Sequence, residues 1–264
     1  MYILPINFDL LINHQLIIYI MKFKVLFLVF VFTMFFGLNN ALSQEVQFGL
    51  DFQVGVPQGE FKDQLDDQLG IGVGGMFGYR FANTPFLVGV DLGFMNFGTE
   101  TRDEPFSTTI PDVRVEVENS YNLFHGNLLF RVIPPNLAVR PYLDGLVGFN
   151  YFFTQTEIRE RGRQNADDAI ATDTNFRDTT LSYGLGGGVK FRVYSGDTAV
   201  NNGEQVNMPY DIHINLGARY MFGREAEYLQ PGSIVRDDQG NVEFDVLQST
   251  TDLLHFKIGI SVSL

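Results

Sequence analysis

The chain has 264 residues, a formal net charge of −13 and no cysteine. Phosphate backbones bind to basic surfaces, so this acidic composition argues against a nucleic-acid partner. Without cysteine the chain can form neither a disulfide framework nor a thiolate metal site.

The first 43 residues predict export. Residues 21–43 begin with Lys22 and Lys24, continue with an apolar run and end with small residues up to Ser43. This order is typical of a secretory signal peptide, and cleavage is expected after Ser43. The alternative is a membrane anchor, but the apolar run has about 14 residues and a spanning helix needs roughly 20. Residues 1–20 are interpreted as an extension upstream of the true start, outside the fold.

From residue 44 onward, apolar and polar residues alternate, which is typical of β-strands with two different faces. Eight segments have this pattern, and no helical period extends over three turns. The segments are 46–56, 71–81, 86–94, 113–132, 143–153, 181–193, 212–222 and 254–264. The sequence therefore predicts an all-β domain over residues 44–264.

The second face of these segments favours a closed barrel over a water-soluble β-sandwich. In residues 71–81 this face carries Gly72, Gly74 and Gly78, and residues 181–193 are similar. Glycine weakens a strand that faces water, whereas the narrow interior of an eight-stranded barrel suits small residues. The apolar face then contacts lipid, and aromatic residues near the strand ends form two girdles. The predicted girdle residues are Phe94, Phe97, Tyr151, Phe153, Tyr220 and Phe222 at one rim and Tyr79, Phe81, Phe191 and Tyr194 at the other.

The connections between the segments agree with such a barrel. Residues 82–85 and 133–138 form short connections, and the connections that alternate with them are longer. Short periplasmic turns and long outer loops are typical of outer-membrane barrels. An even number of strands returns the chain to the side where it began, so both termini are expected in the periplasm. The predicted fold is an eight-stranded antiparallel up-and-down transmembrane β-barrel.

The last segment, FKIGISVSL, alternates up to the final residue. Such a strand is expected to pair with the first strand, because an open edge in hydrocarbon leaves backbone groups without hydrogen bonds. Its ending resembles the assembly signal of outer-membrane barrels, in which a polar residue and a glycine precede alternating apolar residues. The matching residues are Lys257, Gly259, Val262 and Leu264, and Leu264 stands where the signal usually has Phe.

The whole pattern resembles the small outer-membrane β-barrel proteins of Bacteroidota, which are related in architecture to the eight-stranded OmpA, OmpX and OmpW types. The stretch GVPQGEF, residues 55–61, is similar to the place where the first strand of these proteins breaks into a loop. The resemblance covers residues 44–264. It implies this fold and a location in the outer membrane of a Gram-negative cell, but no activity, because members have diverse roles.

Charged residues on the second face are expected to point into the lumen. Their mixed signs predict an ion-pair network, because buried charges must be paired. A polar core that holds the strands in register is favoured over a gated ion pathway, since small barrels fill their interiors. The predicted network residues are Asp51, Arg80, Asp91, Arg131, Asp144, Lys190, Arg192, Arg219 and Lys257.

The segment 113–132 changes its apolar parity. Its apolar residues are odd-numbered up to Val117 and even-numbered from Phe124 onward, which predicts a β-bulge near Leu123. At about 20 residues the segment is twice as long as a membrane crossing needs, so its first half is expected above the bilayer.

The histidines predict neither a metal centre nor catalysis. His213 and His255 are expected near opposite ends of antiparallel strands, too far apart to share a metal ion. His125 and Ser120 are close in sequence, but five residues of strand separate a base from a nucleophile by about 17 Å. We therefore expect no catalytic residue, no metal and no cofactor.

The sequence predicts an outer-membrane protein with a structural or interaction role through its extracellular loops. One alternative is a narrow channel for small or apolar solutes, and a second is a lipid-modifying enzyme. The acidic loops 58–68 and 225–251 are interpreted as solvated, with bridging through divalent cations to lipopolysaccharide as the alternative. Expected partners are outer-membrane lipid, lipopolysaccharide, the barrel assembly machinery and an unidentified extracellular or periplasmic protein.

Overall fold

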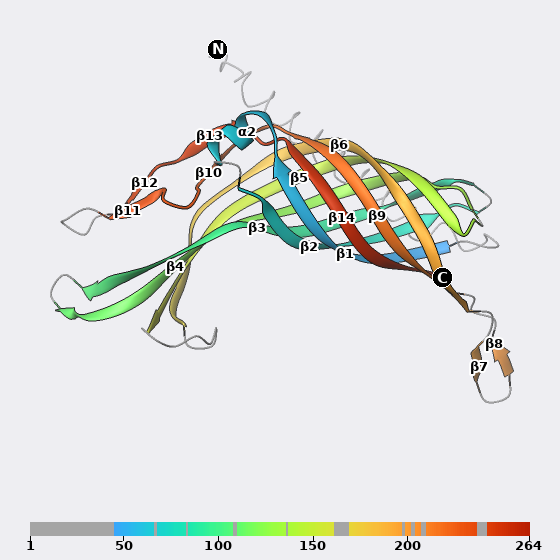
Figure 1. Ribbon diagram of the computed structural model, residues 1–264, viewed down its shortest axis with the longest axis horizontal. Helices are drawn as coiled ribbons and strands as arrows, with labels where there is room; N and C mark the ends of the chain where they lie inside the picture. The colour runs from blue at the N-terminus through green and yellow to red at the C-terminus, as the bar shows by residue number, and fades with distance from the viewer. Residues whose placement is uncertain are drawn as a thin grey trace, which may run out of the picture. The chain divides into compact units, whose positions relative to one another are not determined.

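Eight antiparallel strands close into a barrel (Figure 1), which confirms the predicted fold class. The computed structural model describes residues 45–264, except 66–67, 83, 108–109, 136, 161–168, 197–198, 202–203, 207–209 and 237–241. The predicted signal segment 21–43 and the extension 1–20 lie outside the described residues.

The barrel strands follow one another around the ring in chain order, and the last strand pairs with the first. They are β1 (Glu45–Pro57), β2 (Gly70–Arg80), β3 (Phe86–Ser107), β4 (Ile110–Val132), β5 (Val139–Glu160), β6 (Ala169–Gly196), β9 (Tyr210–Gly223) and β14 (Leu253–Ser263). The closing pair runs in one continuous register from Gln47 opposite Ser263 to Pro57 opposite Leu253. No edge is left along this seam.

The remaining elements are short. They are the helix α2 (Gly59–Gln64) and three hairpins, β7 (Ala199–Asn201) with β8 (Glu204–Val206), β10 (Glu225–Tyr228) with β13 (Leu247–Thr250), and β11 (Ile234–Arg236) with β12 (Val242–Phe244). Within the described part of the chain, no helix has the length and apolar character needed to cross a membrane.

The two ends of the barrel are built differently (Figure 1). At one end, which we call the short-turn end, residues 81–85 and 133–138 join neighbouring strands, and the backbone of Val46 pairs with Leu264. At the other end, the long-loop end, α2 follows β1 and the β10–β13 hairpin follows β9.

Apolar side chains cover the outside of the barrel and polar side chains fill the inside. Leu50 on β1 and Leu185 on β6 are 76% and 71% exposed, whereas Asp91 on β3 and Lys190 on β6 are 0% exposed. Only lipid can cover such a band of exposed apolar side chains without an energetic cost. The direction of the two faces is therefore the one that the alternation predicts.

Four strands continue beyond the barrel at the long-loop end, where they project to the left in Figure 1. β2 pairs with β3 only as far as Asn96, and β9 pairs with β6 only from Ser182 onward. Beyond these points β3, β4, β5 and β6 remain paired with one another as an open sheet. We call this extension, residues 98–107, 110–121, 154–160 and 169–181, the outer sheet. The sequence predicted it only for β4.

The bulge predicted near Leu123 in β4 is wrong. β4 pairs with β5 in one continuous register, and the extra residue is Phe97 in β3, between two residues that pair with β4. The odd-numbered residues of β4 point inward along its described length, including the buried Val115 and Val117. The parity of the apolar residues changes because the interior itself becomes apolar at the long-loop end, not because the strand turns over.

Candidate functional site in the lumen and at its mouth

The centre of the lumen is organised around Asp144 of β5. Arg131 of β4 donates two hydrogen bonds to its carboxylate, from Nε to Oδ1 at 2.6 Å and from Nη2 to Oδ2 at 2.8 Å. Arg219 of β9 donates a third, from Nη2 to Oδ2 at 2.9 Å. One carboxylate therefore serves two guanidinium groups, and all three side chains are almost completely buried.

A second group of ion pairs surrounds Asp91 of β3. Its carboxylate lies 2.8 Å from Arg219 Nη1 and 2.9 Å from Lys257 Nζ. Lys257 of β14 also lies 3.1 Å from Asp51 of β1. We call Asp51, Asp91, Asp144, Arg131, Arg219 and Lys257 the lumen network. It contains three carboxylates and three cations, so its formal charge is zero, and each charge is held by a partner rather than left free for chemistry.

The inward glycines make room for these side chains. A Cβ atom on Gly188 of β6 or on Gly217 of β9 would lie 2.5 Å from the hydroxyl oxygen of Tyr142. The Tyr142 ring in turn lies 3.9 Å from the guanidinium carbon of Arg131. The glycine-rich face therefore does not line an open channel, because neighbouring strands fill the space with long side chains.

The other predicted network residues lie toward the short-turn end. Arg80 of β2 pairs with Glu45, and Arg140 of β5 lies 3.4 Å from Glu45 and 3.2 Å from Asp211. Arg192 lies opposite the buried His213, on the lumen side of β6, and 3.4 Å from Asp211, but at the rim of the barrel its side chain is exposed. Sequence reasoning missed Glu45, Arg140 and Asp211, which lie in the first two residues of their strands.

Lys190 is the most enclosed cation of the short-turn half. Its Nζ donates a hydrogen bond of 2.6 Å to Gln47 Oε1, and the Gln47 amide in turn donates to Glu45. Lys190, Gln47 and His213 are all 0% exposed.

In the central network, the remaining space beside Asp91 and Arg219 has room for about one water molecule. Buried side chains therefore fill the described lumen both in its centre and toward the short-turn end.

An apolar cluster closes the lumen at the long-loop end. Phe61 of α2 is 1% exposed and points into three aromatic rings, with centroid distances of 5.6 Å to Phe97, 5.7 Å to Phe152 and 5.2 Å to Tyr228. We call the cluster the mouth plug, and its buried members are Phe61, Leu65, Met95, Phe97, Leu123, Phe152, Ala226, Tyr228 and Leu253. Phe97 was expected in a lipid-facing girdle, which is wrong, because it shares the inward face of β3 with Asp91 and Met95.

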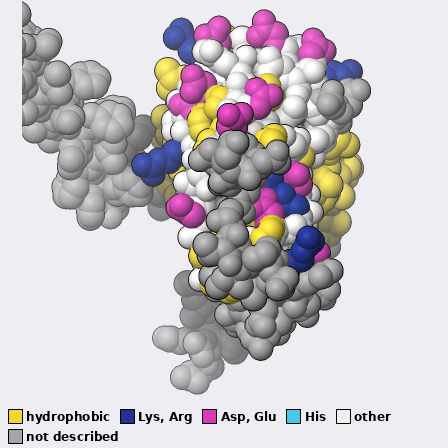
Figure 2. All heavy atoms as spheres, turned by 90° about the vertical axis from the view of Figure 1, so that its left-hand side faces the viewer, with side chains coloured by type: hydrophobic (Ala, Val, Ile, Leu, Met, Phe, Trp, Pro, Cys, Tyr) yellow, Lys and Arg dark blue, Asp and Glu magenta, His cyan; other side chains and the backbone are white. Residues whose placement is uncertain are grey.

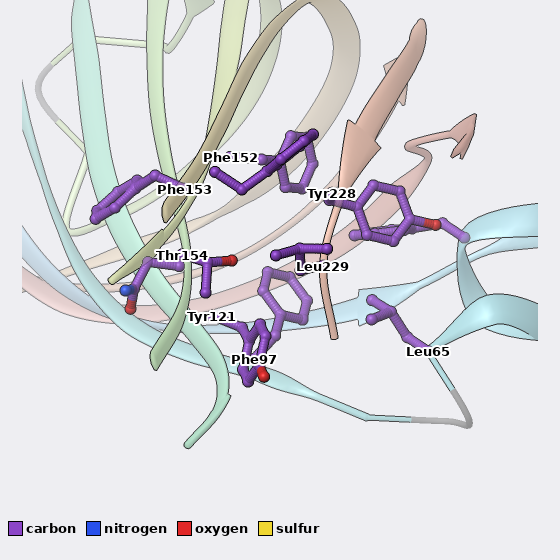
Figure 3. Close-up of a pocket in the computed structure, with 11 residues that line it drawn as sticks. Leu65, Phe97, Tyr121, Phe152, Phe153, Thr154, Tyr228 and Leu229 are labelled. Carbon is purple, nitrogen blue, oxygen red and sulfur yellow. The ribbon is translucent and has the colours of Figure 1, made fainter. Parts of the chain in front are cut away.

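Figure 3 shows the pocket beside this plug, where the side chains of Phe97, Tyr121, Phe152 and Tyr228 converge from four strands. The rings leave room for about one water molecule. The pocket is thus a packed apolar seal and not an open binding site.

Polar contacts hold α2 and the β10–β13 hairpin in place over the mouth plug. Glu60 of α2 accepts hydrogen bonds from the backbone N–H of Thr250 at 3.2 Å and from its hydroxyl at 3.0 Å. Tyr228 and Ser249 share a hydrogen bond of 2.7 Å between their hydroxyl groups. Burial raises the pKa of Tyr228, and the nearby Glu60 carboxylate adds to the rise, so its hydroxyl stays protonated at neutral pH.

Two histidines meet inside the barrel, which sequence reasoning missed. The ring centroids of His125 (β4) and His255 (β14) are 5.3 Å apart, and His125 Nε2 lies 3.5 Å from Asp91 Oδ1. They can meet across the lumen because the positions opposite them are glycines, Gly93 on β3 and Gly55 on β1. The two glycines in register with the two histidines are the sequence signal for this contact.

The other predictions for the histidines were that His213 lies far from His255 and that Ser120 lies far from His125. His213 lies opposite Ser261, six residues along β14 from His255, so the expected distance between the two histidines is confirmed. Ser120 and His125 are separated by an odd number of residues and point to opposite faces of β4. Among the residues that the structure describes, no group of three His, Cys, Asp or Glu side chains is arranged to hold a metal ion.

The residues of the predicted assembly signal fall on both faces of β14. Lys257 belongs to the lumen network, and Gly259 lies against Asp51 of β1, where a Cβ would come within 2.6 Å of the Asp51 Cβ. Val262 and Leu264 share the outward face. Most predicted girdle residues lie on the outside in aromatic pairs, such as Phe94 with Phe153 near the long-loop end and Tyr79 with Phe81 near the short-turn end.

A closed barrel with an apolar outer surface and a paired, buried polar interior defines an integral outer-membrane β-barrel protein. Residues 28–248 match the family model described as outer membrane protein beta-barrel domain, so the chain belongs to this family and is placed in the outer membrane. No curated protein matches the chain.

Several solved structures are similar at low sequence identity. Neisserial surface protein A is 12% identical with a TM-score of 0.35, and the match covers 86% of this chain and 99% of that one. Ail of Yersinia pestis is 15% identical with a TM-score of 0.31, covering 84% and 97%. OprG of Pseudomonas aeruginosa is 14% identical with a TM-score of 0.35, covering 84% and 95%. At these values the similarities carry no argument about function.

Proposed function

We propose that this protein is a non-catalytic surface-interaction protein of the outer membrane, which binds a partner through the outer sheet. The long-loop end faces the cell exterior, and both termini lie in the periplasm. One observation carries the proposal: four strands continue well past the barrel, while the lumen beneath them is filled and closed.

The two edges of the outer sheet differ in a way that suits partner binding. On the β3 side, side chains contact the segment that follows β10: Arg102 Nη1 donates to the Ile234 carbonyl at 2.5 Å and the Gly232 N–H donates to Glu100 at 2.9 Å. In the described part of the chain, no strand pairs with the outer edge of β6 from Ala169 to Arg177. Such an edge offers backbone donors and acceptors to an extended segment of another protein.

The surface around the outer sheet is polar. Figure 2 shows this end of the molecule, with Asp and Glu side chains scattered over it and Lys and Arg side chains between them. Within the sheet, Arg159 of β5 lies 2.9 Å from Glu118 of β4, which ties neighbouring strands together. A partner segment of extended, polar character, with positive charges to match the carboxylates, fits this surface best.

The two alternative functions have less support. A channel for small or apolar solutes needs a path through the lumen, whereas the buried ion pairs and the mouth plug occupy it. A lipid-modifying enzyme needs a nucleophile and a base that contact each other at the membrane surface. His125 and His255 are enclosed in the lumen, and Ser120 points away from His125.

The proposal includes the processing and assembly of the chain. Residues 21–43 act as a signal peptide that is removed after Ser43, and the end of β14 is read by the barrel assembly machinery. Outer-membrane lipid and lipopolysaccharide surround the barrel, and the protein is related to the OmpA, OmpX and OmpW types of Bacteroidota. N-terminal sequencing of the protein from outer membranes tests the processing, and a start before residue 44 would contradict it.

A sheetless variant tests the function. Residues 100–119 and 156–173 are each replaced by an Asn-Gly turn, because Thr99 pairs with Ser120 and Gln155 pairs with Thr174 in the structure. The control variant lacks the β7–β8 hairpin at the short-turn end. Both variants must retain the heat-modifiable mobility of a folded barrel.

Both variants and the parent, in nanodiscs, are used to select binders from displayed random peptides. The proposal expects peptides rich in β-forming residues that bind the parent and the control equally and lose at least tenfold in affinity for the sheetless variant. Selected peptides that bind the sheetless variant as tightly as the parent would contradict it, as would a selection without enrichment.

A further inference from the structure

The histidine pair lies at the boundary between the lumen network and the mouth plug. On β4, His125 stands two residues from Leu123, and on β14, His255 stands two residues from Leu253. Leu123 and Leu253 are both buried members of the plug that Phe61 completes. Each histidine therefore lies one inward position below the apolar seal, and its other side faces the ion pairs.

Charged groups from several strands face the pair, and their charges are already balanced. Asp91 on β3 lies 3.5 Å from His125 but is held by Arg219 of β9 and Lys257 of β14. Lys257 is shared with Asp51 of β1, and Arg219 is shared with Asp144 of β5, which also holds Arg131 of β4. A proton added to either ring finds no carboxylate without a cation partner within the lumen network.

We propose that mild acid unseals the mouth of the barrel through His125 and His255. Protonation of both rings adds two positive charges to a closed site whose formal charge is zero. The charges stand about as far apart as the 5.3 Å between the ring centroids, in surroundings that screen them poorly. The repulsion is relieved when the rings move toward water at the mouth, which displaces Leu123 and Leu253 from Phe61 and releases α2.

Imidazole is the side-chain group that changes charge in water between pH 5 and 8, so the histidine rings are the groups of this cluster that gain a proton when they reach water in mild acid. A proton is bound at less cost when the rings reach water, so acid shifts the population toward the unsealed state.

The absence of cysteine allows a direct test, because one engineered thiol is then the only one in the protein. Met95→Cys places the thiol in the mouth plug at a position that is 0% exposed, and Gln248→Cys places it at an exposed position of β13 as a reference. The rate of reaction with a charged methanethiosulfonate is measured for each variant in nanodiscs at pH 7.5 and 5.0. The ratio of the two rates cancels the effect of pH on the thiol itself.

The proposal expects this ratio to rise at least tenfold at pH 5.0. In the background of His125→Gln with His255→Gln the ratio stays at its pH 7.5 value, whereas the control His213→Gln, on a histidine outside the pair, responds as the parent does. A ratio that is flat in the parent, or that rises equally in the double variant, would overturn the proposal.

Amide hydrogen exchange of α2 in the unmodified protein keeps the proposal testable if the double variant fails to fold. After correction for the intrinsic pH dependence of exchange, residues 59–65 should lose protection at pH 5.0 while the centres of the barrel strands keep theirs. Equal protection of α2 at both pH values would contradict the release of the helix.

Discussion

At the scale of single residues, Asp144 determines whether two cations can stay inside the barrel. Its two oxygens accept hydrogen bonds from Arg131 and Arg219, neither of which reaches water. Loss of one member of a buried ion pair costs more than the pair contributes, because the remaining charge stays buried without a partner. The sequence places all three residues on the inward face, but only the fold shows that they share one carboxylate.

The variant Asp144→Asn should therefore lower the free energy of unfolding by about 3–5 kcal/mol. Urea titration in detergent micelles measures the change. Unfolding is followed by circular dichroism, because the chain has no tryptophan. Asp63→Asn, on the exposed side of α2, is the control and should stay within about 0.5 kcal/mol of the parent. Equal stability of the two variants would show that the lumen charges are solvated.

Gly188 and Gly145 provide a second variant with a matched control. A Cβ on Gly188 would press against the Tyr142 hydroxyl at 2.5 Å and against the backbone oxygen of Leu216, whereas a Cβ on Gly145 would meet nothing closer than 4.0 Å. Gly188→Ala should cost about 1–3 kcal/mol through overpacking. Gly145→Ala should be neutral or stabilise by about 0.4–1 kcal/mol. Thermal unfolding of the two variants measures the difference, and equal stability would contradict the close packing around Gly188.

At the scale of elements, α2 is attached to the barrel mainly through Phe61. The helix has six residues, too few to be stable alone, so its position depends on packing. Phe61→Ala should detach α2 while the barrel strands stay paired. Limited proteolysis of folded protein should then cut within residues 58–69 at least tenfold faster than in the parent. Asp63→Ala is the control, and unchanged cleavage in Phe61→Ala would contradict the anchoring role of the ring.

The barrel strands could be predicted because each has an apolar face that repeats every second residue. Apart from the first half of β4, the outer sheet could not be predicted, since strands that leave the membrane lose this apolar face, as residues 98–107 show. Phe97 and the parity of β4 were misread for a related reason: inside the mouth, apolar side chains point inward. The contact of His125 with His255 depends on glycines of intervening strands, which a strand-by-strand reading does not consider.

At the scale of the whole molecule, the orientation in the membrane decides which end can meet a partner. Gln248→Cys labels the long-loop end, and Thr84→Cys labels the short turn between β2 and β3. A membrane-impermeant maleimide applied to intact cells should react with the first and not with the second. After the outer membrane is permeabilised, both should react. The reverse pattern on intact cells would show that the protein has the opposite orientation, with the outer sheet in the periplasm.

The central claim is that the lumen is closed, so that the protein acts through the outer sheet. Single-channel recording of the purified barrel in planar bilayers at neutral pH tests this claim most directly. We predict no conductance steps above the bilayer background at pH 7.5, because ion pairs and the mouth plug fill the lumen. Regular, reproducible steps from the folded parent protein at this pH would contradict the account.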